Sequence, residues 1–124
     1  MKLLVLPLLL ASASALTFAA DKASLSGNWQ VHSSIAGNDN DQSCTFTQKE
    51  NELAGTCTTN ENKNVNITGK VDGKTVTWSY KSEYNGSPLT VNFEGKLDSD
   101  SKITGITSVP EYSVDGDFTA TQSK

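Results

Sequence analysis

Side chains that carry out acid–base or nucleophilic chemistry are sparse in this sequence. His32 is the one histidine among 124 residues, and there is no arginine. A serine–histidine triad therefore has a single candidate base, and a metal site with several histidine ligands cannot be built. Nucleic-acid binding ordinarily uses a basic face with arginine forks, whereas this chain has a formal net charge of −4. We predict a protein that is not an enzyme, binds no nucleic acid and uses no cofactor or metal ion.

Other patterns that suggest chemistry have simpler explanations. Residues 69–75 resemble the end of a phosphate loop, but the glycine spacing differs and no helical pattern follows. The oxygen-rich run 38–41 lacks the glycine and distal glutamate of a calcium loop, so we expect a solvated loop there. His32, Glu83 and Glu94 fall on outward positions of their segments. We therefore expect a solvated surface histidine and no pair of catalytic carboxylates.

The amino-terminal segment predicts export. Lys2 precedes the apolar run Leu3–Leu10, and the small residues at 11–15 and 19–20 offer cleavage sites. This pattern is typical of a secretory signal peptide over residues 1–20, cleaved between 15 and 20. The apolar run is too short to span a membrane, and no cysteine follows it to carry a lipid anchor. We expect a secreted or periplasmic protein without membrane insertion.

The two cysteines are expected to form a disulfide, because that compartment is oxidising. Between Cys44 and Cys57 the sequence predicts a strand, a turn at Glu50-Asn51 and a second strand. Such a hairpin places the two cysteines directly opposite each other, within about 4.5 Å in a non-hydrogen-bonded antiparallel pair. A redox pair normally has Cys-x-x-Cys spacing, and a metal site needs more ligands.

Period-two alternation of apolar and polar residues runs from Gly27 to about Gln122. In the clearest example, the apolar face of residues 89–97 alternates with Thr, Asn, Glu and Lys. The pattern predicts about eight antiparallel strands with one buried face. The inward positions also carry recurring glycines, namely Gly55, Gly69, Gly95, Gly105 and Gly116. Because glycine weakens a strand, we interpret them as points where the sheet coils sharply and closes.

We therefore predict a single eight-stranded antiparallel up-and-down β-barrel over residues 27–122, preceded by a short tail over 21–26. Such a barrel is filled by side chains or holds one small ligand. Tight turns at one rim are expected over residues 49–52, 72–73 and 98–101. Longer polar loops at the other rim are expected over residues 35–42, 60–63, 84–88 and 109–113. Binding residues favour such loops, so this second rim is the predicted mouth, with Trp29 and Leu97 plugging the opposite end.

Inward aromatic and hydroxyl side chains form the candidate binding site. Trp78, Tyr80, Ser82 and Tyr84 share one face of a strand and change from apolar to polar toward the predicted mouth. The complete set of candidate ligand-binding residues is Ser33, Thr59, Trp78, Tyr80, Ser82, Tyr84, Thr107 and Tyr112. The alternative is that Trp78 and Phe93 belong to a filled core. Asn66 and Asn85 begin glycosylation sequons, which matter only in a eukaryotic host.

Gly27-Asn28-Trp29, followed by alternating strands, resembles the opening of the calycin superfamily, which includes lipocalins, fatty-acid-binding proteins and avidins. The segments 76–79 and 53–56 are similar to strands of the avidin branch. The resemblance implies an up-and-down barrel that binds a small molecule. It does not imply biotin binding, because Phe93 stands where avidins carry a later tryptophan. The lipocalin carboxy-terminal helix is also missing.

A second resemblance covers the first half of the predicted domain. Residues 25–29, with Cys44 and Cys57 on adjacent strands, are similar to the small periplasmic metalloprotease inhibitors. Those proteins are eight-stranded barrels with one disulfide, and their amino-terminal tail enters the protease. The resemblance implies that the residues before Gly27 contact a protein partner.

Two functional hypotheses follow. The favoured one is a secreted or periplasmic, non-enzymatic barrel that binds a small, partly apolar ligand at the rim near Tyr84. The alternative is a barrel with a filled interior that binds a protein partner through its tail, as a protease inhibitor does. A contiguous cavity above ~300 Å³ at that rim favours the first hypothesis, and a packed interior favours the second.

Overall fold

The computed structural model describes residues 24–59 and 62–123, which form eight strands and one short 3-10 helix. The elements are β1 (Gly27–Ile35), β2 (Asn38–Lys49), β3 (Glu52–Thr58), β4 (Asn64–Asp72), β5 (Thr75–Tyr84), β6 (Ser87–Ser99), β7 (Lys102–Val109), η1 (Pro110–Tyr112) and β8 (Val114–Gln122). The predicted signal peptide lies outside the described residues. Within the described ranges, no helix has the length and apolar character needed to cross a membrane.

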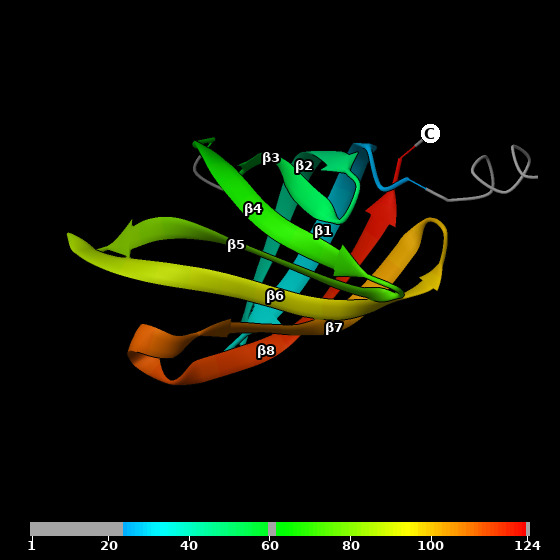
Figure 1. Ribbon diagram of the computed structural model, residues 1–124. Coiled ribbons are helices and arrows are strands. Elements are labelled where there is room, and N and C mark those ends of the chain that lie inside the picture. Colours follow the sequence, from blue (N-terminus) through cyan, green and yellow to red (C-terminus); the bar gives the residue numbers. More distant parts are fainter. Residues whose placement is uncertain (1–23, 60–61, 124) are drawn as a thin grey trace, which may run out of the picture.

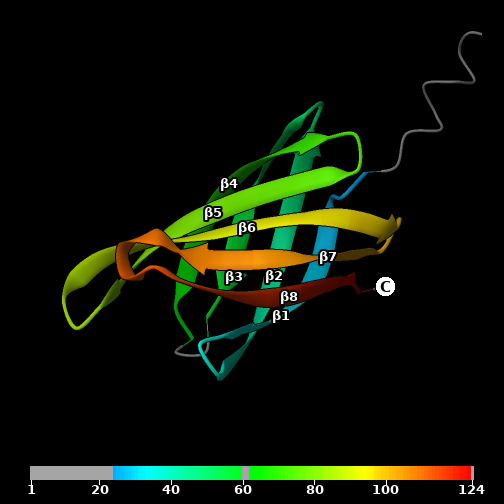
Figure 2. The same cartoon turned by 90° about the horizontal axis from the view of Figure 1, so that it is seen from below.

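The strands close into a barrel in sequence order, as Figures 1 and 2 show. Each strand is antiparallel to the next, and β8 returns to pair with β1. The closing register runs from Trp29 opposite Gln122 to Ile35 opposite Gly116. This pairing confirms the predicted eight-stranded up-and-down barrel.

The inward glycines lie where neighbouring strands approach closely. A Cβ atom added to Gly105 would overlap the main chain of Glu94 and Gly95, and one added to Gly69 would overlap the main chain of Thr77 and Trp78. At each of the five predicted positions the nearest obstacle is a main-chain carbonyl oxygen of the adjacent strand. The missing side chain therefore permits the tight coiling that closes the sheet.

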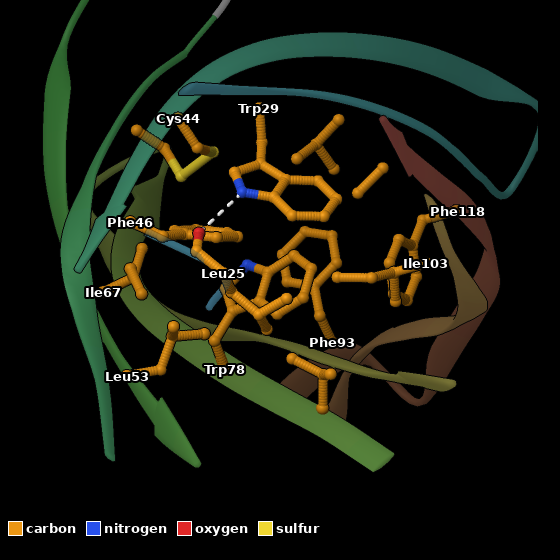
Figure 3. Packing of buried hydrophobic residues seen from close by; sticks show 14 of the residues in the cluster. Leu25, Trp29, Cys44, Phe46, Leu53, Ile67, Trp78, Phe93, Ile103 and Phe118 are labelled. Atoms are coloured by element: carbon orange, nitrogen blue, oxygen red, sulfur yellow. Dashed lines mark hydrogen bonds between the residues drawn. A yellow bond between two sulfur atoms is a disulfide. The ribbon is translucent and has the colours of Figure 1, made fainter. Parts of the chain in front are cut away.

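Aromatic side chains fill the middle of the barrel (Figure 3). Trp78 and Phe93 stack with their ring centroids 4.8 Å apart. Phe46 and Phe118 meet the Trp78 ring edge-on, at 5.1 and 5.3 Å. These contacts join four strands through one aromatic cluster, with ring geometries that favour association beyond the area buried.

Cys44 and Cys57 form the predicted disulfide between β2 and β3. They are direct cross-strand partners, with Cα atoms 4.0 Å apart. Both cysteines are buried on the inner face of the barrel. The disulfide therefore links the two strands from inside the barrel, beside the aromatic cluster (Figure 3).

The closed end of the barrel differs in one respect from the prediction. Trp29 is fully buried there, as expected, but Leu97 is only partly buried at a β-bulge in the β6–β7 register. Leu25 fills the end instead, with 2% of its surface exposed. The indole N–H of Trp29 donates a 2.8 Å hydrogen bond to the main-chain carbonyl of Leu25, drawn as a dashed line in Figure 3.

Two loops expected to be long are two-residue turns. The turn residues Ala36-Gly37 and Asn85-Gly86 all have positive φ, between 52° and 83°. Such pairs match the right-handed twist of a hairpin, so the flanking strands continue to the rim. Residues 38–42, expected to lie in a loop, are therefore the first part of β2. At the opposite rim the turn is Gly73-Lys74 rather than Asp72-Gly73, because Asp72 pairs with Thr75.

Candidate ligand-binding cavity

A cavity of about 640 Å³ occupies the end of the barrel opposite Trp29. Its volume exceeds the ~300 Å³ expected of a small-molecule pocket. The apolar wall consists of Ile35, Val65, Leu89, Val91, Phe93 and Val109. Polar side chains interrupt this wall on β1, β2 and β5, and charged residues, among them Lys81 and Glu83, stand at its margin. The interior is thus packed at one end and hollow at the other.

The structure brings five of the eight predicted site residues to this cavity, namely Ser33, Thr59, Tyr80, Ser82 and Tyr84. Along β5 the burial decreases as expected, from Trp78 in the core to Tyr84, which is 61% exposed. The strand therefore runs from the aromatic cluster to the mouth.

The other three predicted residues do not line the cavity. Trp78 lies beneath its floor, where Phe93 separates it from the hollow part. Thr107 is fully buried in the packed part. Neither the Trp78 indole N–H nor the Thr107 hydroxyl has a hydrogen-bond partner among the described residues. Tyr112, in η1, is exposed and meets the Tyr84 ring edge-on at 6.1 Å, so it contacts the mouth from outside.

Gln42 on β2 is a cavity residue that the sequence analysis missed. It is only 6% exposed, and its amide Nε2 donates a 2.9 Å hydrogen bond across the barrel to the Tyr80 hydroxyl. Its Oε1 atom is buried and has no hydrogen-bond partner in residues 24–59 and 62–123. The sequence could have revealed it, because Gln42 lies two residues before Cys44 and four before Phe46, and therefore on the same inward face of a strand. Assigning residues 35–42 to a loop concealed it.

Tyr80 remains protonated at neutral pH. Burial raises the pKa of its phenol above the ordinary value near 10, and the hydrogen bond from Gln42 opposes that shift only in part. The Tyr80 ring lies 6.2 Å from the Phe93 ring. The cavity therefore combines an aromatic floor with a neutral hydroxyl that can both donate and accept.

Glu111 fastens η1 to β6 beside the mouth. One carboxylate oxygen accepts the Thr90 main-chain N–H and the other accepts the Thr90 hydroxyl, each at 2.9 Å. These bonds, led by the one from the Thr90 main chain, lower the pKa of the Glu111 carboxyl. Because η1 carries Tyr112, this contact also positions the aromatic pair at the mouth.

The outer face holds His32, which is solvent-exposed as predicted. Its Nδ1 lies 2.6 Å from the Asp41 carboxylate, and that hydrogen bond raises the pKa of the imidazole. No group of three or more His, Cys, Asp or Glu side chains in the described part of the chain is arranged to hold a metal ion.

The described part of the predicted tail is attached to the closed end. The Leu25 main-chain N–H donates to Gln48 Oε1, and the Gln48 main-chain N–H donates to the Ser26 hydroxyl, both at 2.9 Å. Residues 21–23 lie outside the described residues. From Ser24 onward the segment therefore packs as part of the barrel rather than as a free arm.

Fold and cavity together define a closed up-and-down β-barrel with an open, partly apolar interior. No family model and no curated protein sequence matches the chain. Among solved structures, it is similar to a redesigned β-barrel with a TM-score of 0.61 and 16% identity, over 81% of this chain and 92% of that one.

Two further redesigned β-barrels, mFAP1 and mFAP0, are both described as bound to DFHBI. The mFAP1 match has a TM-score of 0.56 and 15% identity, over 80% of this chain and 94% of that one. The mFAP0 match has a TM-score of 0.56 and 17% identity, over 79% of this chain and 98% of that one. At these identities the similarity shows the fold.

Proposed function

We propose that this protein is an extracytoplasmic, non-enzymatic module that holds a small, partly apolar ligand in the cavity. The cavity of about 640 Å³, hollow above a packed aromatic floor, is the observation that carries the proposal. An apolar wall with a few polar groups is typical of sites that bind small molecules. That mFAP1 and mFAP0 are described as bound to DFHBI supports small-ligand binding by barrels of this shape.

The cellular location is part of the same proposal. The Cys44–Cys57 disulfide supports an oxidising compartment. Cleavage between residues 15 and 20 remains a prediction, and the measured mass of the mature protein exported from a heterologous host tests it. Kinship with the calycin superfamily likewise remains a prediction that rests on the sequence resemblance.

Titration with the neutral apolar dye prodan tests the binding function. We expect saturable, one-to-one binding that quenches tryptophan fluorescence, because Phe93 on the cavity floor stacks on Trp78. Ser33→Phe fills the cavity from β1 and should weaken binding by ~10-fold or more, equivalent to about 1.4 kcal/mol. Thermal unfolding verifies that this variant is folded, and Val91→Phe provides a second filler.

Ser34→Phe is the matched control, because Ser34 follows Ser33 on β1 and does not line the cavity. It should bind prodan as the unmodified protein does. Absence of saturable binding across a broad panel of apolar compounds would overturn the proposal, as would equal effects of the two serine variants. The remaining expectation would then be a protein partner, as the resemblance to protease inhibitors implies.

A further inference from the structure

The interior contains one polar pair whose hydrogen-bonding capacity is incompletely used. Gln42 on β2 and Tyr80 on β5 both line the cavity, and a 2.9 Å hydrogen bond from the Gln42 amide to the Tyr80 hydroxyl joins them. Gln42 is more than nine-tenths buried, and its Oε1 atom has no hydrogen-bond partner among the described residues. A buried carbonyl without a partner is destabilising, so a group that satisfies it gains binding energy.

The pair offers the same capacity whichever way the amide is turned. With Nε2 donating to Tyr80, the amide oxygen is left as an acceptor and the phenol O–H as a donor. With the amide reversed, Tyr80 donates to the oxygen, which leaves the amide N–H as a donor and the phenol oxygen as an acceptor. The terminal torsion of glutamine is broad, so a small rotation turns the amide toward a ligand. One donor and one acceptor therefore stand side by side.

The surroundings determine what the rest of the ligand looks like. Phe93 lies 6.2 Å from Tyr80, ring to ring, and Val91 and Leu89 continue the apolar wall on the adjacent strand. Gln42 and Tyr80 are uncharged, so an ionic group placed beside them would be desolvated without an opposite charge. These surroundings favour a ligand that has a neutral polar group at one edge of a flat, apolar ring system.

We propose that the Gln42–Tyr80 pair selects ligands with an adjacent N–H and C=O, such as a lactam, imide or other cis-amide, attached to an apolar ring. The planar group places its donor opposite the acceptor of the pair and its acceptor opposite the donor. Its ring then lies against Phe93. This inference rests on the proposed function, because it names the ligand class of the same cavity.

Three compounds of similar shape separate the contribution of the hydrogen bonds to binding from that of the apolar ring. Carbostyril carries the lactam on a fused aromatic ring, N-methylcarbostyril lacks the donor, and naphthalene lacks both polar groups. We expect carbostyril to bind more tightly than N-methylcarbostyril by on the order of 10-fold, because the methylated compound leaves a buried acceptor unsatisfied. Isothermal calorimetry or tryptophan quenching measures the ratio.

Gln42→Met supplies the deciding variant. It nearly preserves side-chain volume and removes both amide groups, so the affinity ratio should fall to near one while naphthalene binding is kept. Retained naphthalene binding also shows that the variant is folded. A steric effect of the N-methyl group would persist in Gln42→Met, whereas a hydrogen-bonding effect would disappear. Gln30→Met, the same change on the exposed outer face of β1, should leave the ratio unchanged.

The outcomes separate this inference from the proposed function. If all three compounds bind with similar affinity, the cavity binds ligands but the pair does not select them, and the inference is wrong. A preference for carbostyril that survives in Gln42→Met overturns it equally. If none of the three compounds binds and the dye titration also fails, the proposed function fails as well.

Discussion

Trp29 and Leu25 close one end of the barrel together. The Trp29 indole N–H donates to the Leu25 carbonyl at 2.8 Å, and both side chains are buried. The bond satisfies the single donor of a fully buried tryptophan. It also holds Leu25 at the end of the barrel that is opposite the cavity.

Leu25→Ala is expected to lower the free energy of unfolding by about 2–5 kcal/mol, because it removes a buried leucine and leaves a cavity against Trp29. Urea denaturation followed by tryptophan fluorescence measures the change. Ser24→Ala, on the exposed neighbouring residue, should change stability by less than about 0.5 kcal/mol. Equal stability of the two variants would mean that Leu25 does not close the barrel.

The Cys44–Cys57 disulfide closes a loop with a sequence separation of 13 residues. Replacing both cysteines by alanine should cost about 3 kcal/mol in the chain-entropy model, measured by urea denaturation under oxidising conditions. The matched control is the double change Thr45→Ala and Thr56→Ala, at the adjacent outward cross-strand pair. If that control is destabilised as much as the cysteine variant, the loss comes from the strands rather than from the disulfide.

Gly105→Ala should destabilise the barrel by about 3 kcal/mol or more, or prevent folding. The new methyl group would overlap the main chain of Glu94 and Gly95, which cannot retreat without separating β6 from β7. Ile106→Ala, at the exposed next residue, should be nearly neutral. Soluble expression and thermal unfolding check both variants, and a stable Gly105→Ala barrel would contradict the close-approach explanation.

His32 should titrate above the ordinary histidine pKa near 6.5, because the Asp41 carboxylate accepts its hydrogen bond. Because the pKa is raised in the folded state, the contact contributes its full stabilisation at pH values below the His32 pKa of the unfolded chain. That contribution is lost as the pH rises through the His32 pKa of the folded protein. Proton NMR of the His32 ring measures the titration directly. Asp41→Asn should lower the His32 pKa more than Asp39→Asn, which acts only through its charge; equal effects would argue against the hydrogen bond.

The barrel fold could be predicted from the sequence, but the positions of Gln42 and Leu25 could not. Alternation and inward glycines predicted the closed barrel because burial of one face is a local, periodic property. Gln42 was missed because it follows the polar run 38–41, and only the tertiary fold shows that this run is a strand whose inner face lines a cavity. Leu25 was missed because it precedes the first strand, and its hydrogen bond from the Trp29 indole N–H uses a main-chain carbonyl, which leaves no pattern in the sequence.

Glu111 should make the order of the mouth dependent on pH. Its carboxyl pKa is lowered chiefly by the hydrogen bond from the Thr90 main chain. A lowered folded-state pKa means that the contact stabilises η1 fully above the ordinary value near 4.5 and that the contribution is lost as pH falls through the folded pKa. Amide exchange of Thr90, corrected for intrinsic rates, should therefore accelerate in that acid range.

Two variants isolate the Glu111 carboxylate in this measurement. Glu111→Gln keeps an acceptor for the Thr90 N–H but cannot ionise, so exchange at Thr90 should lose its acid dependence. Asp115→Asn, an exposed acid at the start of β8, should retain the acid dependence of the unmodified protein. If Thr90 exchange in Glu111→Gln keeps the acid dependence of the unmodified protein, another titrating group loosens the mouth. The tyrosine pair at the mouth, Tyr84 and Tyr112, would then be positioned independently of the Glu111 contact.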